Sequence, residues 1–394
     1  MTKRFQVSAA LLLAAFLVVP SAVSQTVRWT SDSDGNRIQV RIDGDIEYAP
    51  DYRSVRSMSS GAYIRIQREE GRRDWRLEVE REGSDIVYDF RRNGDRIPFE
   101  SAREEIGDLI LYVVRETGAQ AEERVAQMLR SGGPAAVFAE VDLIRSSGAS
   151  ARYLRELMEQ ADLSDPDLQR WAEVTVSEVP SSGDRARLLI GAADEFQGTR
   201  IEEVWFKAAG TIPSSGDRAR TLLAGLDAGM DASNVFGAAA GIPSSGDRTR
   251  VLIKALEGEL SADDLVQLLD AAESIPSSGD KSRVLMAASA KVAPLPSTHD
   301  AFFRAARSVA SSGDRTRVLL FMIENLEMSS ESWMELLQTV RTIPSSGDKA
   351  RILLAASGHV EGEAMEKAYL DAAETIPSSG DRSRVPMALM RDSG

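Results

Sequence analysis

The sequence lacks cysteine altogether and contains only two histidines among its 394 residues. The absence of cysteine excludes disulfide bonds, thiolate metal ligands and a cysteine nucleophile. The two histidines, His299 and His359, stand at different offsets within the repeats described below, and no His-Glu-x-x-His pattern occurs. We therefore expect surface or capping roles for both, no metal or other cofactor, and a fold that depends on packing for its stability.

Long apolar runs are also scarce, and the one near the N-terminus has the form of an export signal. Lys3 and Arg4 precede an apolar run over residues 7–19, and the small residues Ala22-Val23-Ser24 follow it. This run is shorter than the roughly 20 residues that a transmembrane helix needs. We expect residues 1–24 to be a signal peptide, and the mature protein to be periplasmic or secreted and not to span the membrane.

Positive charge is in deficit, with 47 Lys and Arg residues against 61 Asp and Glu residues and a formal net charge of −14. Such an acidic chain is not attracted to nucleic acid or to an anionic membrane surface. The expected partner is instead another envelope protein or a peptide.

Residues 25–100 alternate apolar and polar side chains, which is typical of half-buried antiparallel strands. The alternation is clearest in residues 37–42, 62–66, 75–79 and 86–90, and Asp43-Gly44 and Asn93-Gly94 indicate turns. We expect a small antiparallel sheet whose apolar face is covered by the helices that follow.

Residues 101–145 have helical periodicity and are expected to be adaptor helices. Ser101 and Glu104 have the spacing of a capping box, and Gly118 is placed to end this first helix. A second helix is expected over residues 120–129, and a third from Pro134, which suits a first helical position.

Residues 146–394 repeat one motif, of which Ile212-Pro213-Ser214-Ser215-Gly216-Asp217-Arg218 is a representative copy. The serine pairs begin at Ser146, Ser181, Ser214, Ser244, Ser277, Ser311, Ser345 and Ser378, with steps of 30 to 35 residues. In the copy from Ser181 we expect helices over residues 182–196 and 199–210. A single pair of helices cannot bury its apolar faces alone, so the repeats predict an α-solenoid of about eight units, the last one truncated.

The serine and the aspartate three residues later predict a capping box at the start of each repeat. The residues expected to cap helices in this way are Ser181 and Asp184, Ser214 and Asp217, Ser244 and Asp247, Ser277 and Asp280, Ser311 and Asp314, and Ser345 and Asp348. These serines have no positioned base beside them in the pattern, so they indicate caps and not nucleophiles.

Two cations follow each aspartate and oppose the helix dipole there, so each copy needs something to offset them. Either an arginine of one unit reaches the aspartate or a helix-end carbonyl of its neighbour, or the stacked guanidinium groups bind a carboxylate-bearing peptide or an anionic glycan. The candidate partner-binding residues are Arg187, Arg220, Arg250, Arg283, Arg317 and Arg351.

Aromatic residues recur at similar positions in the second helices, namely Trp171, Trp205, Phe236, Phe303, Trp333 and Tyr369. Two interpretations are open for them. They are either core residues between layers or the lining of a binding groove.

The motif resembles that of exported bacterial proteins with tandem helical repeats of a Ser-Ser-Asp-Tyr-Asp-Lys type, which are often found beside, or fused to, antibiotic-sensor-type membrane zinc metallopeptidases. The segment Asn93-Gly94-Asp95-Arg96-Ile97-Pro98-Phe99 shares this resemblance, whereas a lone glycine such as Gly183 replaces the Asp-Tyr of that motif. A looser resemblance to HEAT-type repeats comes from the aspartate and arginine near a helix start. The resemblance implies a helical repeat fold and a regulatory association with an envelope peptidase, and no peptidase motif is present in this chain.

The sequence thus predicts an α+β protein that is mostly α, a small N-terminal sheet followed by an α-solenoid. The expected function is that of a non-catalytic exported scaffold or protein-binding and peptide-binding solenoid, with no catalytic residue. One alternative is a self-assembling envelope protein that associates through the half-repeat after Ser378, where Met387, Leu389 and Met390 lie near an uncovered face. The other is a hydrolase acting on the cell wall through a carboxylate pair.

Overall fold

The computed structural model describes residues 24–33 and 36–392, and its contacts divide the chain into two compact units, Met1–Ala119 and Gln120–Gly394. The prediction of a mostly helical α+β protein with a small antiparallel sheet is confirmed. The predicted signal peptide lies outside the described residues, apart from Ser24, which begins the first strand.

The first unit contains an antiparallel sheet with the strand order β1-β2-β4-β5-β6-β7, in which β3 pairs with β2. The strands are β1 (Ser24–Ser33), β2 (Asn36–Tyr48), β3 (Val55–Met58), β4 (Tyr63–Glu70), β5 (Arg73–Glu82), β6 (Asp85–Arg92) and β7 (Asp95–Ile97). All of these pairings are between antiparallel strands.

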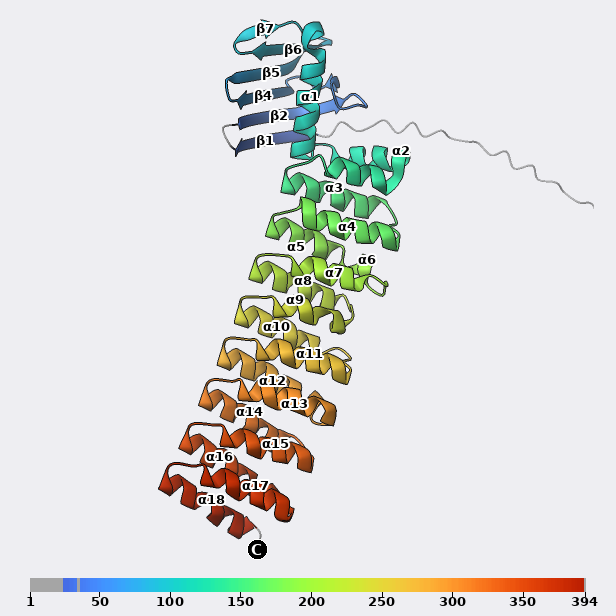
Figure 1. The fold of residues 1–394 in the computed structure, drawn as a ribbon. Coiled ribbons are helices and arrows are strands. Elements are labelled where there is room, and N and C mark those ends of the chain that lie inside the picture. The colour runs from blue at the N-terminus through green and yellow to red at the C-terminus, as the bar shows by residue number, and fades with distance from the viewer. Residues whose placement is uncertain (1–23, 34–35, 393–394) are drawn as a thin grey trace, which may run out of the picture. The chain divides into compact units, whose positions relative to one another are not determined.

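The register of the sheet places the apolar residues of neighbouring strands side by side on one face. One row across the strands consists of Val40, Ile66, Leu77 and Phe90, all of them buried. Helix α1 (Phe99–Thr117) lies across this face and contributes Ile106, Ile110 and Val113 to the same core (Figure 1). The expectation that a following helix covers the apolar face is therefore confirmed.

The glycines that indicated turns serve two different purposes. Asn93 and Gly94 both have positive φ angles, 53° and 90°, and form the tight turn between β6 and β7. Gly44 lies inside β2, so the turn predicted there was wrong. A Cβ atom at Gly44 would lie 2.6 Å from the Cβ of Ala62, and this glycine is needed for a close approach of two backbone segments.

Helix α1 also begins earlier than expected. Its N-cap residue is Pro98 and no side chain caps it, so the capping box predicted at Ser101 was wrong. Its end is as predicted, because Gly118 adopts the left-handed conformation with a φ angle of 63°.

The second unit consists of paired helices. They are α2 (Ala121–Val141), α3 (Ser147–Gln160), α4 (Asp165–Glu178), α5 (Ser182–Gly191), α6 (Ala193–Phe196), α7 (Glu202–Gly210), α8 (Ser215–Asp227), η1 (Ala232–Val235), α9 (Phe236–Ala240), α10 (Ser245–Ala255), α11 (Ala262–Glu273), α12 (Ser278–Val292), η2 (Pro296–Thr298), α13 (His299–Arg307), α14 (Ser312–Asn325), α15 (Ser330–Arg341), α16 (Ser346–Ala356), η3 (Ser357–His359), α17 (Gly362–Glu374) and α18 (Ser379–Asp392). Helix α2 is kinked at Gly133, just before Pro134, where two separate helices were expected.

The segment 101–145 is shared between the two units. Helix α1 belongs to the core of the sheet, whereas Val125 and Val137 of α2 belong to the core of the helical unit. The adaptor region expected from the sequence is therefore divided near Ala119.

The helical unit is a stack of two layers (Figure 1). In the first layer, which begins with α3, α5, α8 and α10 and continues to α18, each helix contacts the next one. In the second layer, which runs from α4 through α7, α9, α11, α13 and α15 to α17, neighbours also contact one another. A single hydrophobic core extends through both layers, as expected of an α-solenoid. No helix in the described part of the chain combines the length and apolar character needed to cross a membrane.

Candidate binding surfaces of the repeat array

The first serine of each motif caps a first-layer helix. Its Oγ atom accepts a hydrogen bond from the backbone N–H of the aspartate three residues later, at 3.3 Å in the pair Ser214 and Asp217. The same bond joins Ser181 to Asp184, Ser244 to Asp247, Ser277 to Asp280, Ser311 to Asp314, Ser345 to Asp348 and Ser378 to Asp381. This bond satisfies one of the free N–H groups at each helix start.

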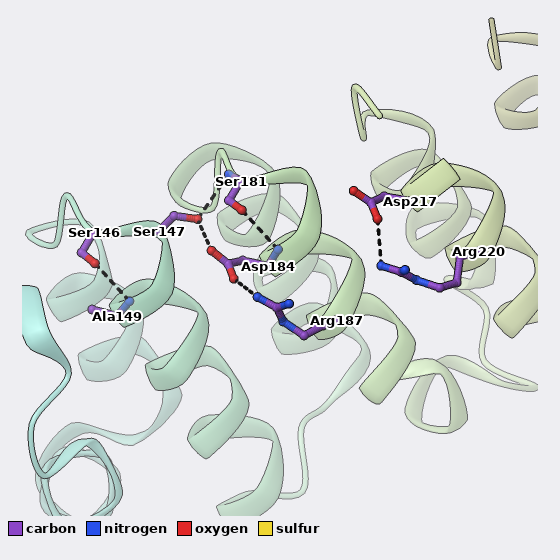
Figure 2. A network of polar contacts seen from close by, with 8 residues as sticks. All are labelled: Ser146, Ser147, Ala149, Ser181, Asp184, Arg187, Asp217 and Arg220. Atoms are coloured by element: carbon purple, nitrogen blue, oxygen red, sulfur yellow. Dashed lines mark hydrogen bonds and ion pairs between the residues drawn. The ribbon is translucent and has the colours of Figure 1, made fainter. Parts of the chain in front are cut away.

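The aspartate does not complete a capping box in these described copies, and in two of them, Asp184 and Asp348, it bonds a serine of the preceding repeat. Ser147 Oγ donates to Asp184 Oδ2 at 3.0 Å and accepts from the backbone N–H of Ser181 at 3.2 Å (Figure 2). The second serine of one repeat therefore supplies the bond that the aspartate of the next was expected to make. In other copies the second serine of the preceding repeat likewise accepts from the backbone N–H of Ser214, Ser244, Ser311 and Ser378. The hydroxyl of Ser312 donates to Asp348 in the way that Ser147 donates to Asp184.

The first cation of each motif from Ser181 to Ser345 contacts the ends of second-layer helices. Arg185 is 7% exposed and donates to the carbonyl of Val179, which ends the second helix of the preceding repeat. It also donates to the carbonyl and hydroxyl of Thr211, which ends the second helix of its own repeat. Arg248, Lys281, Arg315 and Lys349 are similarly buried and reach Ser274, Ser308, Thr342 and Thr375. Burial lowers the pKa of each of these five cations. The expected contact with a neighbour's helix-end carbonyl is thus made by the first cation where that cation is arginine.

The second cation of each motif, which is the predicted partner-binding residue, remains on the surface. Arg220 pairs with Asp217 of its own copy at 2.8 Å, and Arg187 pairs with Asp184 in the same way (Figure 2). Arg250, Arg283, Arg317 and Arg351 repeat this pairing, and the exposed fractions of the six side chains lie between 56% and 67%. Exposed pairs of this kind contribute about 0.3–0.5 kcal/mol, so these arginines contribute little to stability.

An apolar residue follows each of these arginines at a spacing of three, on the same helix face. These residues, all half-buried, are Ile190, Leu223, Ile253, Met286, Leu320 and Leu354. We call the six arginines together with these six residues the arginine ridge. The ridge carries one guanidinium group and one accessible apolar side chain on each first-layer helix from α5 to α16.

The recurring aromatic residues belong to the core. Trp171, Trp205, Phe236, Phe303, Trp333 and Tyr369 are at most 7% exposed. The indole N–H of Trp205 donates to the carbonyl of Leu189 at 2.9 Å. The hydroxyl of Tyr369 donates to the carbonyl of Leu353 at 3.0 Å. Both bonds join the two helices of one repeat, and the burial of all six side chains excludes the alternative that they line a groove.

The two histidines do not share an environment. His299 is 3% exposed and its ring nitrogens lie 3.1 Å from the Oγ of Ser332 and 3.3 Å from the carbonyl of Ala293, so its predicted surface position was wrong. His359 is exposed and stacks on Trp333 with ring centroids 4.9 Å apart.

The last first-layer helix, α18, has an exposed apolar surface. Met387 and Met390 are 56% and 69% exposed, whereas Leu389 is 7% exposed and belongs to the core, contrary to the expectation from the sequence. Arg382, which corresponds to the buried Arg185, is exposed.

Comparisons of the chain with protein-family models, with curated proteins and with solved structures returned no match.

Proposed function

We propose that the protein is a non-catalytic exported scaffold whose arginine ridge binds an extended acidic segment of another envelope protein. The observation that supports this proposal is the sixfold repetition of an exposed arginine that stabilises the fold little. A guanidinium group offers several N–H donors in one plane and matches a carboxylate well. Because the aspartate engages the guanidinium on one side, the arginine is held in place with other donors still exposed.

The spacing of the ridge favours an extended partner. Stacked helices lie roughly 8–10 Å apart, and an extended chain rises about 3.3 Å per residue. Three residues of an extended segment therefore span about one repeat, so an acidic residue at every third position would meet successive arginines. Apolar residues between the acidic ones would contact side chains such as Leu223 and Ile253, which are half-buried beside the arginines.

The resemblance of the repeat motif favours an envelope membrane peptidase, or a substrate of one, as the source of this segment. In this proposal the scaffold regulates the peptidase by occupying an acidic stretch, and export by the N-terminal signal brings the two together. Hydrolysis of the cell wall is not part of this proposal.

The proposal is tested with an 18-residue peptide that has glutamate at every third position, and with a peptide of the same composition whose glutamates are clustered. The triple variant R220E/R250E/R283E should lower the affinity for the regularly spaced peptide by at least about tenfold, since each lost pair is worth up to about 1 kcal/mol. The matched control is K207E/R341E/K367E, which has the same change in net charge on exposed second-layer residues. Equal losses in both triple variants, or equal affinity for both peptides, would contradict the proposal.

A second candidate function, association between copies, is supported by the exposed side chains of Met387 and Met390 on α18. This association would add a further helical layer to the stack and bury both methionines.

A further inference from the structure

Among the six copies from Ser181 to Ser345, one lacks the regular contact between the first cation and a hydroxyl at the end of the second helix of its repeat. Five buried cations reach a threonine or serine hydroxyl at the end of the second helix of their own repeat, at distances of 2.7–3.0 Å. Arg218 meets Gly241 at the corresponding position, and its Nη1 atom donates to the backbone carbonyl at 2.6 Å. A Cβ atom on residue 241 would lie only 2.8 Å from that Nη1 atom.

With glycine at position 241, Arg218 makes fewer hydrogen bonds than the other arginines of the series. The Nη2 atoms of Arg185, Arg248 and Arg315 each donate to a backbone carbonyl at 2.6–2.8 Å. Arg218 uses Nε and Nη1 in this way, and its Nη2 atom has no hydrogen-bond partner among the described residues. The side chain is half-buried where the others are buried.

The second-layer helix beside Arg218 is also unusual. Helix α9 has five residues and follows the short 3-10 helix η1, whereas the other second-layer helices from α4 to α17 have nine to fourteen. Gly210, Gly237 and Ala238 provide little side-chain volume here, and a hollow of about 700 Å³ lies between α7, α9 and α11. This volume is in the range of small-ligand sites.

Arg218 is the cation without a carboxylate partner among the residues around this hollow. Lys207 pairs with Glu203 at 2.7 Å, and Asp264 is bound to Ser261 at the start of α11. The side-chain amides of Asn234 and Gln267 line the same hollow and have no hydrogen-bond partner in the described part of the chain. Such amides both donate and accept, as backbone peptide groups require.

We propose that this hollow binds the C-terminal carboxylate of a short peptide. The free Nη2 edge of Arg218 donates to the carboxylate, and Asn234 and Gln267 bond the peptide groups that precede it. Gly241 leaves space for the carboxylate beside the guanidinium. Apart from Arg218 of α8, the residues that line the hollow lie on second-layer helices or at their ends, and none of them belongs to the arginine ridge, so the two sites are separate.

The test uses the full-length mature chain and a library of tripeptides with free C-terminal carboxylates, observed by saturation-transfer NMR. We expect binding that weakens at least tenfold when the same library is amidated, and that exceeds the binding of acetate alone. G241T supplies the hydroxyl present in the other repeats and should abolish binding without lowering the melting temperature. G237D places a competing carboxylate in the hollow and should also abolish binding, since a Cβ atom there meets nothing within 4 Å.

The matched control is G279D, which adds the same charge on α12, where a Cβ atom also meets nothing within 4 Å. It should bind the library as the wild type does. The proposal is overturned if the wild type binds no member of the library, if amidated peptides or acetate bind as tightly, or if folded G241T retains affinity. The triple variant of the arginine ridge should leave this binding unchanged, so failure of one site is distinguishable from failure of the other.

Discussion

Replacing Arg248 and replacing Arg250 should have very different effects, although the two residues are two positions apart in one helix. Arg248 is 7% exposed, and its Nε and Nη2 atoms donate to the carbonyl of Ile242 at 3.1 and 2.6 Å. Its Nη1 atom donates to Ser274, at the end of the second helix of the same repeat, at 2.7 Å. Arg250 is 59% exposed and pairs with Asp247 of its own helix.

The magnitudes follow from what each deletion leaves behind. R248A removes the charged donor of two acceptors near the repeat interface, and each such bond contributes about 1.5–3 kcal/mol. The variant also no longer bears the cost of burying the Arg248 charge, which offsets part of this loss. We therefore expect the free energy of unfolding to fall by about 3 kcal/mol. R250A removes one exposed ion pair and should cost less than about 0.5 kcal/mol. R248K should recover most of the loss, because Lys281 and Lys349 occupy the same position in other repeats.

The assay is urea unfolding combined with hydrogen exchange of the backbone amides, because a repeat array can unfold in parts. R248A should lower protection mainly in α10 and α11 and shift the unfolding midpoint. R250A should leave both unchanged. The reasoning is wrong if the two variants lose similar stability, or if R248A costs less than about 1 kcal/mol.

Two further predictions concern the lysine positions and the last helix. Burial lowers the pKa of Lys281 and Lys349, so the folded state releases these protons at a lower pH than the unfolded state. Stability should therefore rise with pH over the alkaline interval below the usual lysine pKa, and K281R/K349R should remove this rise in urea midpoints; an unchanged pH profile would contradict it. If copies associate through α18, light scattering should show a mean mass that increases with concentration for the wild type and not for M390E, because Met390 is 69% exposed. A constant wild-type mass would exclude this association.

Features that depend on neighbouring residues in the chain could be predicted from the sequence. The serine caps, the start of each first-layer helix and the left-handed Gly118 involve groups within one turn of one another. The period of the motif predicted the stacking, since a lone helix pair cannot bury its apolar faces. The role of the second serine was missed, because Ser147 and Asp184 are 37 residues apart and meet only after two repeats have stacked.

The burial of the first cation and the exposure of the second could also have been predicted from the sequence. Arg248 precedes Val251, Leu252 and Ala255 at spacings of three, four and seven, so it lies on the apolar face of its helix, and Arg250 does not. A cation on that face must find carbonyl or hydroxyl acceptors in the interface, because a buried charge without partners is costly. The exposed cation has no such constraint. Ridge variants should therefore test partner binding without unfolding the array, and variants of the inner cations should test the array itself.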